Sequence, residues 1–253
     1  ASDVYKRQDI YRPEDSQEKI LPVIINVHGG GLIIGNKEFN RYFCALLCKK
    51  GFLVYSIEYR LIPDCLIYDQ IADVFMAMDY IKERLAADGG DSSHVYMAGD
   101  SGGACLITYA NAIQNSTNIA RAANVTPSGL RINALGLISG MFYTSRFDKI
   151  GLFLPKYLYG RDYKKTSFAK YVNPENRELL NSLAPVWLVT SHNDFLRRYT
   201  TDFEKALTRA EREHELVIFP KNKKLTHAFS VFEPFMPESG AVIDMMVEYL
   251  RKF

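Results

Sequence analysis

The sequence predicts an α/β fold in which a mostly parallel sheet carries helices on both of its faces. Short β-branched runs alternate with amphipathic segments, and strands separated by helices form parallel sheets. Residues 23–27 are almost continuously apolar, which is typical of a strand buried on both sides. The 253 residues suffice for one domain with a sizeable core.

Each element follows from local pattern. The predicted strands are residues 9–11, 23–27, 53–57, 95–98, 134–139, 186–190 and 216–219. The predicted helices are residues 39–50, 68–87, 104–114, 201–213 and 240–251. The second helix places Ile71, Val74 and Met78 at three- and four-residue spacing, so one face is apolar. Gly51 and Gly89 end the first two helices.

Residues 142–183 lose this alternation and are rich in aromatic side chains. We expect them to form a small cap insertion over the site, where the aromatic rings line a substrate pocket. The alternative is that these rings only pack the insertion onto the core, since aromatic residues serve both roles.

The first eight residues are excluded from this single domain, which we place at 9–253. Residues 2–8 read Ser-Asp-Val-Tyr-Lys-Arg-Gln, and a transposase adapter used in sequencing libraries translates to Asp-Val-Tyr-Lys-Arg-Gln. We interpret residues 1–8 as a sequencing-adapter artefact, with natural sequence upstream missing. A genuine basic N-terminus is the alternative.

Composition excludes several classes of function. A net charge of +2 without long basic runs argues against a nucleic-acid partner. No apolar run reaches the ~18 residues of a membrane span, so we expect no stable membrane insertion. The four cysteines form no C-x-x-C pair and no zinc spacing with histidine, so we expect reduced cysteines and no metal site.

Gly99-Asp100-Ser101-Gly102-Gly103 fits the G-x-S-x-G pattern between a predicted strand and a predicted helix. In α/β-hydrolases this turn exposes a nucleophilic serine, and its glycines allow close approach on both sides. The pattern alone is common, but its strand–turn–helix context favours Ser101 as a nucleophile.

His28-Gly29-Gly30-Gly31 directly follows the buried strand 23–27. Glycines let backbone N–H groups converge, as an oxyanion hole requires, and we expect Gly30, Gly31 and Gly102 to be the donors. The alternatives are a flexible loop or a phosphate loop. The phosphate loop fails because Asn36-Lys37 stands where Lys-Ser/Thr is needed.

A serine nucleophile needs a base and an orienting acid, in the chain order Ser, Asp/Glu, His. His227 follows the last predicted strand and is the best base, ahead of His192 and His214. Asp194 follows the strand 186–190 and is the best acid, although a helix N-cap is the alternative role. Asp202 lies further along a helix, where we expect it to face solvent.

Together these motifs resemble the hormone-sensitive-lipase-like carboxylesterases of the α/β-hydrolase fold. They are residues 28–31, 59–64, 99–103, 194–196 and 227–229, and the resemblance covers about residues 9–253. It implies Ser101 as nucleophile, His227 as base and Asp194 as acid, with oxyanion donors at Gly30, Gly31 and Gly102. The chain departs at residues 62–64, where the family usually has Ala-Pro-Glu, and at Gly102, where alanine is usual.

The expected function is therefore hydrolysis of short-chain acyl or acetyl esters through an acyl-enzyme, without a cofactor. A peptidase or amidase of the same fold and a non-catalytic binding protein are the alternatives. The expected partner is a small-molecule ester, and a homodimer stays open. We expect a cytoplasmic location, with a lost signal peptide as the alternative.

Overall fold

The computed structural model describes residues 7–16 and 19–253, and it contains one seven-stranded sheet in the order β1-β3-β2-β4-β5-β6-β7. The strands are β1 (Asp9–Tyr11), β2 (Leu21–Val27), β3 (Leu53–Ile57), β4 (Gly90–Asp100), β5 (Ala134–Ile138), β6 (Val186–Ser191) and β7 (His214–Phe219). Only β1 is antiparallel to its neighbour, so the predicted mostly parallel sheet is confirmed. The interpretation of residues 1–8 falls largely on residues outside those described.

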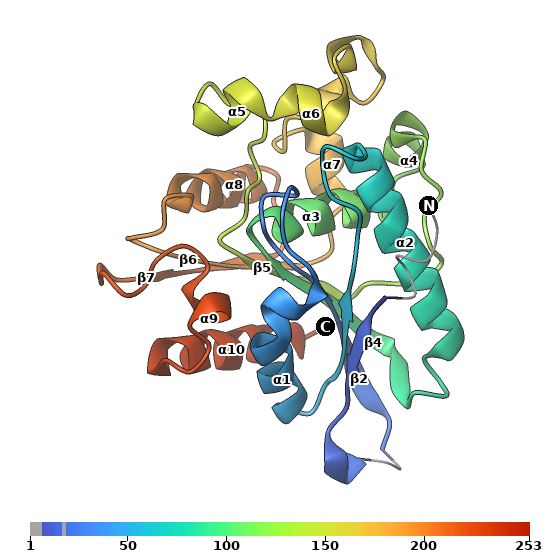
Figure 1. Ribbon diagram of the computed structural model, residues 1–253, viewed down its shortest axis with the longest axis vertical. Coiled ribbons are helices and arrows are strands. Elements are labelled where there is room, and N and C mark those ends of the chain that lie inside the picture. The colour runs from blue at the N-terminus through green and yellow to red at the C-terminus, as the bar shows by residue number, and fades with distance from the viewer. Residues whose placement is uncertain (1–6, 17–18) are drawn as a thin grey trace.

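Helices cover both faces of the sheet, as predicted. Figure 1 shows α1 (Arg41–Lys49), α9 (Phe229–Phe232) and α10 (Pro237–Leu250) on one side. The other side carries α2 (Ile67–Arg84), α3 (Ser101–Asn115) and α8 (Arg197–Arg209), and α4 (Thr117–Ala123) follows α3. No helix in the described part of the chain is long and apolar enough to cross a membrane.

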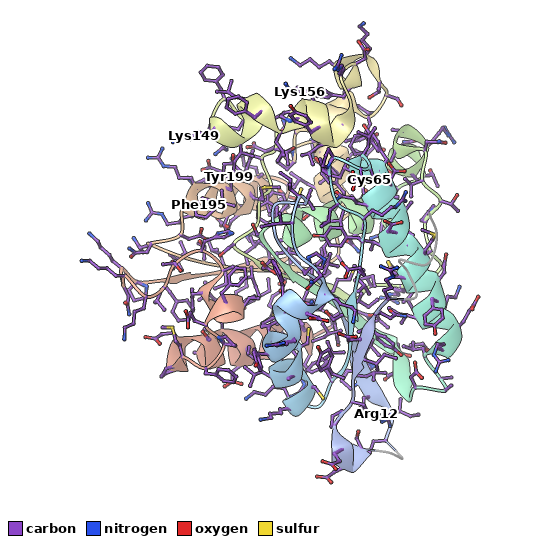
Figure 2. All side chains as sticks on the ribbon, in the orientation of Figure 1. Arg12, Cys65, Lys149, Lys156, Phe195 and Tyr199 are labelled. Carbon is purple, nitrogen blue, oxygen red and sulfur yellow. The ribbon has the colours of Figure 1, made fainter. Side chains whose placement is uncertain are left out.

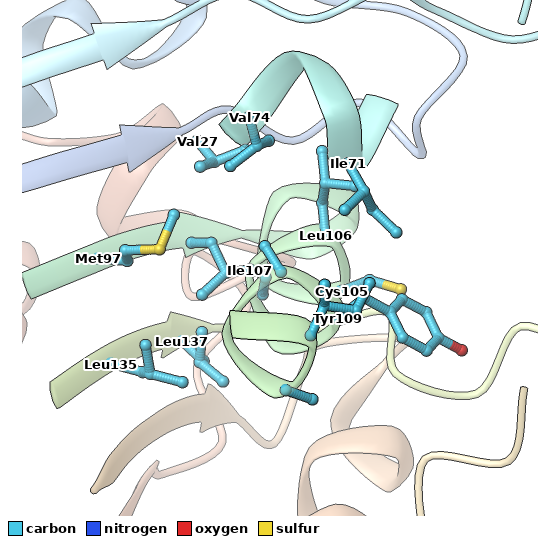
Figure 3. Close-up of a cluster of buried hydrophobic side chains, with 14 of the residues drawn as sticks. Val27, Ile71, Val74, Met97, Cys105, Leu106, Ile107, Tyr109, Leu135 and Leu137 are labelled. Carbon is cyan, nitrogen blue, oxygen red and sulfur yellow. The ribbon is translucent and has the colours of Figure 1, made fainter. Parts of the chain in front are cut away.

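Alternating strand residues divide the core into two layers. Val23, Ile25 and Val27 of β2 face the layer beneath α2, α3 and α8, whereas Ile24 faces the layer beneath α1 and α10. Figure 3 shows the first layer, where Ile71 and Val74 of α2 and Leu106 and Ile107 of α3 lie against the sheet. The apolar burial on both faces explains why the strand sequences are almost continuously hydrophobic.

Parallel register brings the carboxyl ends of the central strands to one edge of the sheet. Val27 of β2 pairs with Gly99 of β4, and Asp100 pairs with Ile138 of β5. Ser191, the last residue of β6, pairs with Phe219 of β7. Loops from five strands therefore emerge side by side, where ligands of such sheets bind.

Three helices begin earlier in the structure than the sequence predicts. Helix α3 starts at Ser101 rather than 104, because the glycines that follow are held in the helix by packing despite their low helix propensity. Helix α8 starts at Arg197 rather than 201, and α10 starts at Pro237, a favoured first helical residue, rather than 240. The short helices α4 and α9 were not predicted.

The segment 142–183 contains α5 (Lys149–Phe153), α6 (Pro155–Tyr159), the 3₁₀ turns η4 (Tyr163–Lys165) and η5 (Ala169–Tyr171), and α7 (Arg177–Asn181). Figure 1 shows α5 and α6 at the top of the view, beyond α3 and α8. Some rings of the segment are buried against the core: the Tyr159 hydroxyl lies 2.9 Å from that of Tyr109 on α3, and Phe168 is fully buried. Others, such as Phe153 and Tyr157, are exposed. The buried rings therefore pack the segment onto the core, and the exposed rings are candidates for lining a substrate pocket.

Candidate active site

Ser101 stands at the sharp turn between β4 and α3. Its φ of 50° lies in the left-handed region, which non-glycine residues rarely adopt. Gly99 and Gly103 flank it closely against β2, since a Cβ on either would lie 2.5 or 2.2 Å from the Val27 carbonyl oxygen. Any side chain at these two positions would force the turn away from β2. Only 8% of Ser101 is exposed.

A continuous chain of hydrogen bonds links Ser101, His227 and Asp194. The Nε2 atom of His227 lies 2.9 Å from Ser101 Oγ, and its Nδ1 atom lies 2.7 Å from Asp194 Oδ1. The Asp194 side chain is fully buried, whereas 15% of the His227 side chain is exposed. The structure thus brings together the three residues predicted from three distant strand ends, in the geometry of a nucleophile, a base and an orienting acid.

Further donors hold the Asp194 carboxylate in place. Oδ1 also accepts a hydrogen bond from the Leu196 N–H at 2.8 Å, and Oδ2 accepts one from Thr190 Oγ1 at 2.9 Å. Burial by itself raises the pKa of Asp194, but hydrogen bonding and charge from His227, with smaller contributions from Ser139 and Leu196, bring the pKa below its ordinary value of 3.8. The carboxylate is therefore held in its charged form.

The glycine loop after β2 lies over the start of α3. Gly30 and Gly31 have φ of 104° and 62°, and the loop closes where the N–H groups of Ile33 and Ile34 donate to the Gly30 carbonyl. Within the described residues, neither the Gly30 nor the Gly31 N–H has an acceptor. Gly102 lies in the first turn of α3, where N–H groups lack intrahelical acceptors. These three N–H groups are available to a developing oxyanion.

The departure from the family at Gly102 has a structural counterpart. A Cβ at this position would lie 2.9 Å from the Leu32 backbone nitrogen and 3.1 Å from that of Gly31. Glycine therefore lets the loop approach α3 more closely than an alanine would in this arrangement.

Asp100 and Gly29 join the loop to the serine turn. The buried Asp100 accepts hydrogen bonds at Oδ1 from the Gly29 N–H (3.1 Å) and from Asn40 Nδ2 (2.9 Å). Burial raises the pKa of Asp100 above its ordinary value, although Asn40 and Gly29 act in the opposite direction. Through Gly29, this carboxyl stabilises the glycine loop.

His28 is fully buried and supports the same loop. Its Nδ1 atom lies 2.8 Å from the Gly29 carbonyl oxygen, and Nε2 lies 3.1 Å from Glu58 Oε1. The Tyr59 ring stacks on the imidazole at 4.3 Å, and the Tyr59 hydroxyl donates to the His28 carbonyl. The geometry makes His28 a structural residue of the loop.

The other candidates from the sequence lie in different surroundings. His192 Nδ1 contacts Arg197 at 2.8 Å, and His214 lies beside Glu204. Asp202 forms ion pairs with Arg146 and Lys205. These contacts involve neither Ser101 nor His227, so none of the three residues serves as a second base or acid beside them.

Four residues at the site were not singled out from the sequence: Thr190, Ser139, Asn40 and Glu58. Thr190 lies at the end of β6, just before Asp194, and Ser139 directly follows β5. Their position at a strand end is the signal that could have identified them. Asn40 and Glu58 offer no such signal, because only tertiary folding brings them to Asp100 and His28.

An open cavity of about 370 Å³ lies between the glycine loop and residues 149–157. Its lining is almost entirely apolar and consists of Gly31, Ile33, Met141, Lys149, Ile150, Phe153, Leu154 and Tyr157. The Met141 N–H donates to the Ser101 carbonyl at 3.0 Å, so this lining starts beside Ser101. Across the described part of the chain, no three His, Cys, Asp or Glu side chains are grouped as metal ligands.

Comparison with known proteins gives a consistent result. A family described as the alpha/beta hydrolase fold matches residues 24–230. A probable isoprenylcysteine alpha-carbonyl methylesterase of Oryza sativa subsp. japonica is 29% identical over 185 residues, covering 69% of this chain and 44% of that protein. A tuliposide A-converting enzyme of Tulipa gesneriana is 30% identical over 131 residues, covering 47% of this chain and 35% of that protein. The chain spans less than half the length of these curated relatives.

Among solved structures, esterase B from Lactobacillus rhamnosis superposes with a TM-score of 0.91 at 23% identity, covering 100% of this chain and 82% of that one. A bacterial heroin esterase superposes with a TM-score of 0.72 at 24% identity, covering 96% and 78%. At these identities the likeness concerns the fold.

Proposed function

The chain belongs to the α/β-hydrolase fold family, and on that premise we propose that it is a carboxylic ester hydrolase acting through Ser101, His227 and Asp194. The observation that carries the proposal is the hydrogen-bonded chain from Asp194 through His227 to Ser101 Oγ, next to unpaired N–H groups. Relatives named as esterases support the same reaction class.

The acylation step follows from this geometry. Since Asp194 accepts from His227 Nδ1, that nitrogen carries the proton and Nε2 is free to accept one from Ser101. Ser101 Oγ attacks the ester carbonyl while His227 takes its proton. The N–H groups of Gly30, Gly31 and Gly102 stabilise the oxyanion of the tetrahedral intermediate, and each such donor contributes about 3 kcal/mol in comparable hydrolases.

The intermediate collapses when His227 gives its proton to the leaving alcohol, which departs and leaves Ser101 acylated. Water then enters, His227 takes a proton from it, and the hydroxide attacks the acyl carbonyl. The second tetrahedral intermediate collapses as its bond to Ser101 Oγ breaks, the carboxylic acid is released, and His227 returns its proton to Ser101.

We assign the acyl part of the substrate to the apolar cavity. The leaving alcohol has to lie beside His227, which protonates it, and the cavity lining contains no residue of the His227 loop. The cavity starts at Gly31 and Met141, beside Ser101, and its apolar walls fit an aliphatic chain.

A labelling experiment combined with a substrate panel tests this function. A fluorophosphonate probe should label wild-type protein at Ser101, as identified by peptide mass spectrometry, and should leave Ser101→Ala unlabelled. Wild type should hydrolyse p-nitrophenyl acetate and butyrate faster than aminoacyl p-nitroanilides. Absence of labelling in folded protein would overturn the enzymatic proposal, and preferred cleavage of the anilides would assign a peptidase or amidase instead.

A further inference from the structure

The outer wall of the acyl cavity is built by two short helices: α6, which buries Pro155, Leu158 and Tyr159, and α5, which has much less support. Five of the eight lining residues lie between Lys149 and Tyr157, on α5, α6 and the residue that joins them. Helix α5 has no buried residue, and Phe153 is 68% exposed. The position of this wall therefore depends on what holds α5 to the rest of the molecule.

Asp148 provides that attachment at the start of α5. Its Oδ1 atom caps the helix, accepting hydrogen bonds from the N–H groups of Ile150 and Gly151 at 3.0 Å each. Its Oδ2 atom accepts a hydrogen bond from the Tyr199 hydroxyl at 2.6 Å. One carboxylate thus caps the N-terminus of α5 and links this helix to α8, which begins just after the Asp194 loop. Figure 2 labels Lys149, the first residue of α5, and Tyr199 of α8.

The Tyr199 ring is itself held firmly. It packs edge-to-face against Tyr143 with ring centroids 5.4 Å apart. The guanidinium of Arg146 lies 3.8 Å from the Tyr143 ring centroid and 5.3 Å from that of Tyr199, and Arg146 is fixed by an ion pair with Asp202 at 2.9 Å. Little freedom is left for the hydroxyl that reaches Asp148.

We propose that the Tyr199–Asp148 hydrogen bond is a positioning device for substrate specificity. By fixing α5, it sets how far the cavity extends from the serine and which acyl chains fit it. The contacts of Tyr199 are with Asp148, Tyr143 and Arg146 and not with Ser101 or His227. It therefore affects the position of the cavity wall and not the reacting groups. This inference rests on the proposed ester hydrolysis.

Two tyrosine variants provide a matched test. Tyr199→Phe removes the hydroxyl that holds Asp148 and keeps the ring beside Arg146. Tyr143→Phe is the control, because its hydroxyl donates to Glu175 at 2.9 Å, away from α5, while its ring contacts the same arginine. Kinetic constants are measured on p-nitrophenyl acetate, butyrate and hexanoate.

For Tyr199→Phe we expect kcat/KM on hexanoate to fall roughly tenfold, mainly through KM, with acetate changed less than about twofold. A hydrogen bond to a charged group justifies this size of effect. Tyr143→Phe should keep the wild-type chain-length profile. Equal losses on all three esters, an unchanged profile in Tyr199→Phe, or the same change in both variants would overturn the proposal.

Hydrogen exchange separates this proposal from the proposed function. Backbone amides of residues 149–157 should exchange faster in Tyr199→Phe than in wild type and Tyr143→Phe, whether or not the protein hydrolyses esters. Wild-type protein without esterase activity would refute the function, whereas unchanged exchange in this segment would refute the attachment.

Discussion

Replacing Asp194 with asparagine tests how the acid orients His227. In general, an asparagine at this position can hold the imidazole in the wrong tautomer, which costs about 10⁴-fold in kcat. Here Oδ1 accepts from both His227 and the Leu196 N–H, and the latter can only donate. The amide oxygen should therefore stay at the Oδ1 position, with the NH₂ group directed at the Thr190 hydroxyl. His227 would keep its Nδ1 proton.

The expected loss is then that of the negative charge alone. A carboxylate and an imidazolium about 4 Å apart interact with about 4 kcal/mol at an effective dielectric constant of 20. This bounds the loss at about 10³-fold, and the retained hydrogen bond from Nδ1 should reduce it further. Asp194→Ala removes charge and orientation together, and we expect about 10⁴-fold.

The assay is steady-state hydrolysis of p-nitrophenyl butyrate by wild type and both variants, with circular dichroism as the control for folding. Asp194→Asn should retain at least tenfold more activity than Asp194→Ala. If the two variants are equally impaired, the Leu196 N–H does not fix the amide and the reasoning is refuted.

Three further changes are predicted. Gly30→Ala should lower kcat about 10²-fold or more, because its Cβ would lie 1.9 Å from the Ile34 carbonyl oxygen. Gly31→Ala should lose less in the same assay, because its Cβ has open space and only the φ of 62° opposes it. The Tyr171 hydroxyl, followed by other donors, lowers the pKa of Glu178 to about 2, so the stabilisation by this carboxylate is complete above pH 4.5 and is lost as pH falls toward 2. In urea unfolding, Glu178→Gln should make the free energy of unfolding depend less on pH over this range, and an unchanged pH dependence would contradict this. Phe195 is 74% exposed, and its ring centroid lies 4.4 Å from that of His227, where it can stabilise the imidazolium. Phe195→Ala should therefore lower kcat/KM a few-fold with Tm nearly unchanged, whereas a large loss of Tm would indicate a structural role instead.

The sheet could be predicted because its strands are buried on both faces, which leaves a local signature. Residues 23–27 and 53–57 are hydrophobic for that reason, and the structure has β2 and β3 there. The start of α3 could not be placed, because glycines at 102 and 103 are poor helix formers locally. Their place in the helix follows from contact with Val27 and the glycine loop, which are distant in sequence.

The site divides in the same way. Ser101, Asp194 and His227 could be selected because strand ends and chain order restrict the choice, and the structure brings them within hydrogen-bond distance. The cap is different. The attachment of α5 depends on a pairing between Asp148 and Tyr199, 51 residues apart, and no local pattern indicates which tyrosine reaches which carboxylate.

Backbone strain shows how the separate loops depend on one another. Six described non-glycine residues have positive φ, and four of them lie around the site: Leu32, Ser101, Ser139 and Ala228. Such conformations cost of order 1–3 kcal/mol each and persist only where the surroundings hold them.

Each of these four residues forms a hydrogen bond with a loop other than its own. The Leu32 carbonyl accepts from the Ile62 N–H, the Ser101 carbonyl accepts from the Met141 N–H, and Ser139 Oγ accepts from the Ala228 N–H. A loop that loosens therefore releases strain in its partner. Ser101, the glycine loop and the loop of His227 are kept in place by mutual contacts among strand-end loops, so the geometry of the site depends on their common packing at one edge of the sheet.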